Sequence, residues 1–149
     1  MPTGAKNFFL IFTSLLFVVF LAFLVYSRRG PAGPELVYAP QGELPPGFDE
    51  KLILDDNAAI KGSYSVDYEK DNFGQRTATF TSSLTLVQLF EKYKEYFVKN
   101  GWLIRKENTS HPKIRGISAA KGGVGATVVI LDKGNLREVQ VTNVESLQN

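Results

Sequence analysis

The residues that could carry out chemistry in this chain of 149 residues are few and far apart. Its single histidine, His111, lies in the loop-like stretch Asn-Thr-Ser-His-Pro, and there is no cysteine. A zinc site or a catalytic dyad would need a second strong partner for that histidine. Two carboxylate pairs, Asp55 with Asp56 and Asp67 with Glu69, could serve acid–base catalysis or hold a hard cation, but solvated surface charge is their commoner role. The sequence therefore predicts no catalytic site, no metal site and no enzyme activity.

A glycine-rich stretch at residues 121–127, KGGVGAT, raises the question of phosphate binding. It resembles the deviant phosphate-binding loop KGGxGKT of the partitioning ATPases. Ala126 stands where that family has its phosphate-binding lysine, and the following TVVILD is typical of a strand. A phosphate loop instead leads into a helix whose N-terminus faces the phosphate. We therefore interpret the stretch as a hairpin turn and predict no bound cofactor.

Charge is unevenly distributed along the chain, although the net charge of +2 gives no indication of a nucleic-acid partner. Residues 49–71 contain seven carboxylates and three lysines, a net charge of −4, whereas residues 92–121 carry a net charge of +6. Such a dipole could dock on anionic headgroups, on an acidic partner or on the acidic stretch of a neighbouring copy. Alternatively, the two stretches are neighbours and neutralise each other.

Aromatic residues suggest a second kind of surface. Tyr64, Tyr68, Phe73 and Trp102 could form a platform for a small ligand or polymer beside the basic stretch, or they could belong to the core. The predicted binding surface combines both kinds of residue and consists of Lys99, Arg105, Lys106, Lys113, Arg115, Lys121, Tyr64, Tyr68 and Trp102.

An apolar segment precedes all of these residues. Residues 8–26 carry no charge, and at about 1.5 Å per residue they span roughly 28 Å, close to the thickness of a bilayer's hydrocarbon core. We predict a single-pass transmembrane helix, a signal anchor, after a short tail of residues 1–7. A cleaved signal peptide, the alternative, would have a shorter apolar stretch and small residues at the cut. Positive charges flank both ends almost equally, and we favour an extracytoplasmic soluble domain.

A linker rich in proline and glycine is predicted at residues 27–47. Five prolines fall between residues 30 and 47, which precludes a regular helix and favours an extended spacer. The soluble domain is then predicted at residues 48–149.

The periodicity of this domain switches between two and 3.6, which is typical of a mixed α+β fold. Thr85 and Gln88 form a capping box that should start a helix, and Asn100 and Gly101 should end it. Alternating residues predict two strands before this helix. Four strands are predicted after it. The first begins at Trp102, and the other three span residues 114–120, 126–132 and 137–144. Residues 128–131 are predicted to lie in the central strand.

The predicted order β-β-α-β-β-β-β implies one helix on one face of a mainly antiparallel sheet. A single helix covers only part of such a sheet, so either the sheet curls strongly or its far side is an interaction surface. We therefore expect a membrane-anchored, non-enzymatic interaction or assembly module of the cell envelope, with a protein partner in or at the membrane. The alternative is a membrane-anchored domain that binds a small ligand or a polymer. A homo-oligomer is possible but not indicated.

Overall fold

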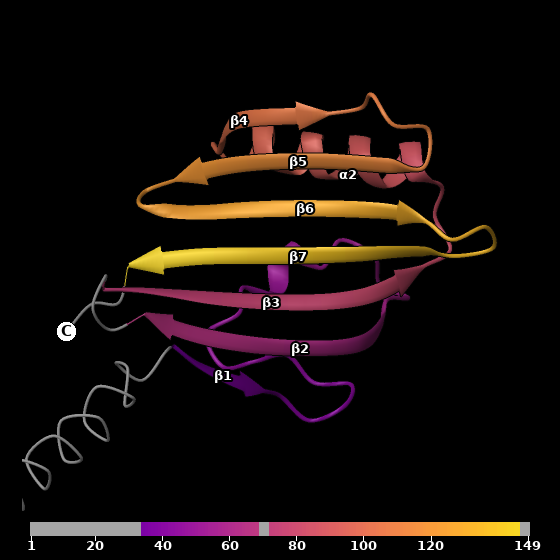
Figure 1. Cartoon of the computed structure of the whole chain (residues 1–149). Coiled ribbons are helices and arrows are strands. Elements are labelled where there is room, and N and C mark those ends of the chain that lie inside the picture. The colour runs from indigo at the N-terminus through magenta and orange to yellow at the C-terminus, as the bar shows by residue number, and fades with distance from the viewer. Residues whose placement is uncertain (1–33, 69–71, 147–149) are drawn as a thin grey trace, which may run out of the picture. The chain divides into compact units, whose positions relative to one another are not determined.

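The structure, a computed structural model, describes residues 34–68 and 72–146. In this part of the chain, one antiparallel sheet and one α-helix form an α+β fold (Figure 1). The predicted tail and transmembrane helix lie outside the described residues. Among the residues that are described, no helix is long and apolar enough to cross a membrane.

The sheet has seven strands in the order β1-β2-β3-β7-β6-β5-β4, and each neighbouring pair is antiparallel. β7 occupies the middle, one place from β6, so the prediction that residues 128–131 lie in the central strand is wrong by one strand. The strands are β1 (Glu35–Tyr38), β2 (Ala59–Tyr68), β3 (Phe73–Ser82), β4 (Leu103–Asn108), β5 (Ile114–Lys121), β6 (Val124–Asp132) and β7 (Arg137–Ser146).

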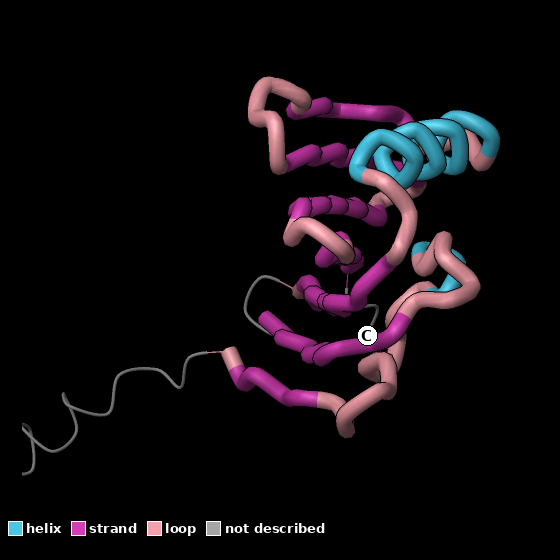
Figure 2. Tube along the Cα trace, turned by 90° about the vertical axis from the view of Figure 1, so that its right-hand side faces the viewer, coloured by secondary structure: helices cyan, strands magenta, loops and turns pink. Residues whose placement is uncertain are grey.

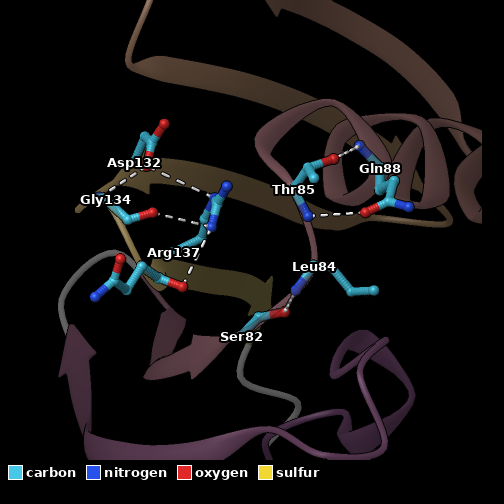
Figure 3. Close-up of polar contacts among 8 residues, drawn as sticks. Ser82, Leu84, Thr85, Gln88, Asp132, Gly134 and Arg137 are labelled. Atoms are coloured by element: carbon cyan, nitrogen blue, oxygen red, sulfur yellow. Dashed lines mark hydrogen bonds and ion pairs between the residues drawn. The ribbon is translucent and has the colours of Figure 1, made fainter.

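The helix α2 (Leu86–Lys99) begins where the sequence predicts, at N-cap Thr85. Figure 3 shows the capping box: the Gln88 amide donates to Thr85 Oγ1 at 3.2 Å, and the Thr85 amide donates to Gln88 Oε1 at 2.9 Å. These bonds satisfy amides that have no partner within the helix. At the other end, Asn100 is the C-cap and Gly101 takes a φ of +72°, the left-handed conformation that glycine adopts without strain.

One apolar stripe of α2 packs on the sheet. Its buried residues are Leu86, Leu89, Phe90, Tyr93 and Phe97, and the helix lies against β4, β5 and β6. On the opposite side of the helix, Lys99 pairs with Glu95 at 2.6 Å. The Lys99 ammonium holds the pKa of the Glu95 carboxyl below its ordinary value.

The glycine-rich stretch forms the β5–β6 hairpin. Lys121 pairs with Val124, and the two intervening residues, Gly122 and Gly123, have φ values of +55° and +84°. A two-residue hairpin loop with positive φ at both positions calls for glycine. The stretch is thus a turn between two strands, and no helix N-terminus follows it to face a phosphate.

The folded unit begins at Pro34, earlier than the predicted boundary at residue 48. β1, inside the predicted linker, pairs with residues 64–67 of β2. Pro45 and Phe48 are buried. The prolines that preclude a helix do not preclude this arrangement, because carbonyl groups accept hydrogen bonds whether or not the residue has an amide hydrogen.

Residues 39–58 cover the half of the sheet that α2 leaves bare, and they include the short 3₁₀ helix η1 (Glu50–Leu52). Four side chains hold this covering segment: Ser63, Arg76, Tyr93 and Ser82, the last of which donates to Asp55. Ser63 Oγ donates to the Glu43 carbonyl at 2.6 Å and Arg76 Nε to the Pro46 carbonyl at 2.9 Å. Tyr93 Oη of α2 donates to the Leu52 carbonyl at 2.8 Å. Figure 2 shows the helix and the covering segment on the same side of the sheet.

Candidate functional site

Three of the residues with the chemistry of a catalytic or metal site, His111, Asp55 and Asp67, make contacts within the fold. His111 lies exposed in the β4–β5 loop, where its Nδ1 accepts from the Lys113 amide at 3.2 Å. Asp55 is buried and accepts from Ser82 Oγ and from the Asn57 amide. Asp67 pairs with Arg76 at 2.6 Å. Within the described residues no group of three or more potential metal ligands comes together; Glu69 lies outside that part of the chain.

The basic residues of the predicted binding surface lie on α2, β4 and β5 and do not converge on one point. Lys121 Nζ donates to the Asn100 carbonyl at the end of α2, at 2.7 Å. Arg115 donates to the Thr109 carbonyl at 2.6 Å, at the other end of β5. Arg105 lies at a register shift in β4, and Lys106 follows it, exposed. These residues, with Lys99 and Lys113, give one end of the sheet a basic character.

The predicted aromatic platform is divided between the two ends of the sheet. Tyr64 contacts Tyr38 with ring centroids 6.0 Å apart, and Tyr68 stacks on Phe73 at 4.4 Å. Trp102, which precedes β4, contacts Phe97 of the core at 5.4 Å. Four strands separate β2 from β4. The geometry therefore gives the ligand-binding alternative no single platform.

The acidic and basic stretches are likewise separated by the strand order. Residues 34–68 contain seven carboxylates and two lysines, a net charge of −5, and they form β1, β2 and the covering segment. Residues 86–121 carry a net charge of +5 and form α2, β4 and β5. The four ion pairs found in the described part of the chain join no residue of one group to a residue of the other. The two ends of the sheet thus keep opposite charge.

The largest uncovered surface is the face of the sheet opposite α2 and the covering segment, which we call the open face. Among the described residues, no helix or strand packs on it (Figure 2). Side chains of a strand alternate between the two faces, so the register of the strands defines a short end row on the open face, Tyr68 with Phe73, and four longer rows.

The first two of the four longer rows cross all seven strands, from β1 to β4. The first row is Leu36, Val66, Gln75, Val144, Gly125, Ala120 and Leu103, and the middle row is Tyr38, Tyr64, Thr77, Thr142, Thr127, Ser118 and Lys106. The third row is Gly62, Thr79, Gln140, Val129, Gly116 and Asn108, and the fourth is Ala59, Thr81, Glu138, Leu131 and Ile114.

These rows carry little charge. Lys106, at the β4 edge, and Glu138, in the fourth row, are their only charged members. At the centre, Thr77 Oγ1 and Thr142 Oγ1 lie 3.0 Å apart in a hydrogen bond, and Gln75 Nε2 donates to Thr77 Oγ1 at 3.3 Å. A solvated face of an antiparallel sheet is ordinarily polar. The open face combines polar residues, mainly threonines, with small residues and aliphatic side chains.

Of the predicted binding residues, Tyr64, Tyr68 and Lys106 belong to the open face. The threonines that form its centre were not predicted, although their alternation in residues 77–81 is visible in the sequence. Their significance depends on which strands lie side by side, and a strand pattern alone does not provide this information.

Comparison with known proteins identifies no relative. No protein-family model, no curated protein and no solved structure matches this chain. The function is therefore argued from the geometry of the chain itself.

Proposed function

We propose that this chain is a membrane-anchored, non-enzymatic interaction module whose soluble domain binds a protein partner through the open face. The observation that carries the proposal is a surface that spans the whole sheet, carries only Lys106 and Glu138 as charged members of its rows, and is covered by no described helix or strand. Extended surfaces that are depleted of charge and carry exposed aliphatic and aromatic side chains are typical of binding interfaces. Thr127 lies exposed near its middle and the exposed Leu36 and Leu103 at its two edges.

The other side of the sheet supports this assignment. It buries the apolar core, including Phe80, Val128 and Val139, under α2 and the covering segment. Polar groups on this side hold the covering segment in place. Arg76, for example, donates to the Pro46 carbonyl and pairs with Asp67. Residues of the kind that could act in catalysis thus stabilise the fold, while the open face remains available for a partner.

The membrane anchor in this proposal is the uncharged segment of residues 8–26. It is long enough to span a bilayer once, and we place the soluble domain outside the cytoplasm. The anchor would confine the domain to the envelope and restrict its partners to proteins in or near the membrane.

The experiment introduces a charge at the centre of the open face. In the full chain, Thr127→Glu should abolish capture of the partner by chemical crosslinking in intact cells, because a buried unpaired carboxylate is strongly unfavourable. Val87→Glu is the matched control: Val87 is 57% exposed on α2, on the opposite side of the sheet. Equal capture by both variants and by the unmodified chain would overturn the proposal.

A further inference from the structure

The position of β7 gives the open face an approximate symmetry. β7 is the fourth of seven strands. A two-fold axis parallel to β7 and lying on the open face would place β1 of one copy over β4 of another, β2 over β5 and β3 over β6. A regularly twisted sheet is mapped onto its own twist by such an axis, so two open faces related in this way would remain parallel across their width.

Residue sizes in the first row match under this rotation. Val66, which is 7% exposed in the single copy, would face Ala120 of the other, and Gln75 would face Gly125. At the edges, Leu36 would face Leu103; these two side chains are 45% and 56% exposed. Large side chains opposite small ones allow two surfaces to interdigitate, which close packing requires.

The middle row matches in chemistry. Thr142 would face its own counterpart on the axis, and the exposed Thr127 would lie over the position of Thr77, whose side chain is fully buried within the single copy. Tyr38, which is 70% exposed at the β1 edge, would face Lys106 at the β4 edge. A lysine ammonium over a tyrosine ring is a favourable pair.

Charge and chain direction favour the axis parallel to β7 over a two-fold axis that lies in the same plane but runs perpendicular to the strands. A two-fold axis perpendicular to the strands would place each basic end over a basic end, and Lys106 over Lys106. The axis parallel to β7 instead places the basic end of one copy over the acidic end of the other. It also leaves the direction of β1 unchanged, so both copies would begin at the same end of the assembly. Two chains anchored in one bilayer require this arrangement.

The available area suits a dimer. Six strand spacings of about 4.8 Å and three steps of about 6.7 Å along the strands give a planar area of about 600 Å². Projecting side chains add to this figure, and stable interfaces bury about 800 Å² per partner.

We propose that the partner of the open face is a second copy of this chain, docked face to face about a two-fold axis parallel to β7. This inference rests on the proposed use of the open face for binding and names its occupant.

The test uses full chains with single cysteines, since the natural sequence has none. Two differently tagged copies, one with Leu36→Cys and one with Leu103→Cys, are coexpressed and treated in membranes with a bismaleimide that bridges about 10 Å, the spacing of packed sheets. We expect a crosslinked dimer only when both variants are present. Two Leu36→Cys copies should not react with each other, because about 29 Å of sheet width separates them. Val87→Cys paired with Leu103→Cys is the control and should give no dimer.

The remaining outcomes distinguish this inference from the proposed function. A dimer of Leu36→Cys with itself would indicate pairing of β1 edges and overturn the face-to-face arrangement. Absence of any dimer, together with capture of a different protein that Thr127→Glu abolishes, would overturn the second copy as occupant and leave the interaction module standing. Absence of both would overturn the two proposals together.

Discussion

At the scale of single residues, buried polar groups connect the elements that cover the sheet. Ser82 at the end of β3 donates to Asp55 of the covering segment. It also accepts from the Leu84 amide at 3.1 Å, just before α2 (Figure 3). Tyr93 connects α2 to the same segment through the Leu52 carbonyl. These bonds fix the covering segment against both the sheet and the helix.

Tyr93 provides a test of this role. Burial raises the pKa of Tyr93 well above the ordinary tyrosine value. Near pH 10 and above, the unfolded chain therefore loses a proton that the folded chain keeps, and the free energy of unfolding falls as the pH rises, by at most about 1.4 kcal/mol per unit. Tyr93→Phe should cost about 1 kcal/mol at neutral pH by removing the hydrogen bond. The same substitution should also remove the part of the alkaline fall in the free energy of unfolding that comes from Tyr93.

Denaturant unfolding of the full chain in mild detergent, between pH 7 and pH 11, measures both effects. Tyr96→Phe is the control for the hydrogen bond, because Tyr96 lies only partly buried on the same helix, although burial raises its pKa as well. An identical alkaline decline in the natural chain and in Tyr93→Phe would contradict the assignment.

At the scale of elements, local signals predict the helix well. The capping box predicts its first residue, and the spacing of five apolar side chains predicts the face it buries. The hairpin at Gly122 and Gly123 is equally local. β1 gave no such signal: its four residues are all exposed and stand between prolines, and it is a strand only because β2 offers it an edge.

The capping box permits a quantitative prediction. Thr85→Ala should lower the free energy of unfolding by about 1 kcal/mol, because the Gln88 amide loses its acceptor. Thr85→Ser keeps the hydroxyl and should stay close to the natural chain. Urea unfolding followed by circular dichroism measures the difference; equal losses in both variants would show that the hydroxyl is not the cause.

At the scale of the whole molecule, the pairing of β3 with β7 decides the arrangement. β3 precedes the helix and β7 follows it, with three strands between them in the sequence. No local pattern predicts that these two strands pair. It places the acidic and basic stretches at opposite ends and aligns the threonines of β3, β7 and β6. For this reason the sequence predicted Tyr64, Tyr68 and Lys106 of the open face but not its centre.

The proposed anchor makes a prediction about topology. A single cysteine at Ser110, which is exposed in the β4–β5 loop, should react with a membrane-impermeant maleimide in intact cells. The unmodified chain has no cysteine and is the background control. Labelling only after lysis would place the domain in the cytoplasm and contradict an envelope partner.

The central claim is that the open face binds a partner, and site-specific photo-crosslinking tests it most directly. A photoreactive residue is introduced at Thr127 of the full chain, and for comparison at Val87 on α2, and intact cells are irradiated. We predict a discrete crosslinked protein species from Thr127, of twice the chain's mass if the partner is a second copy, and none from Val87. Crosslinking from Val87 alone, or from neither site, would contradict the claim.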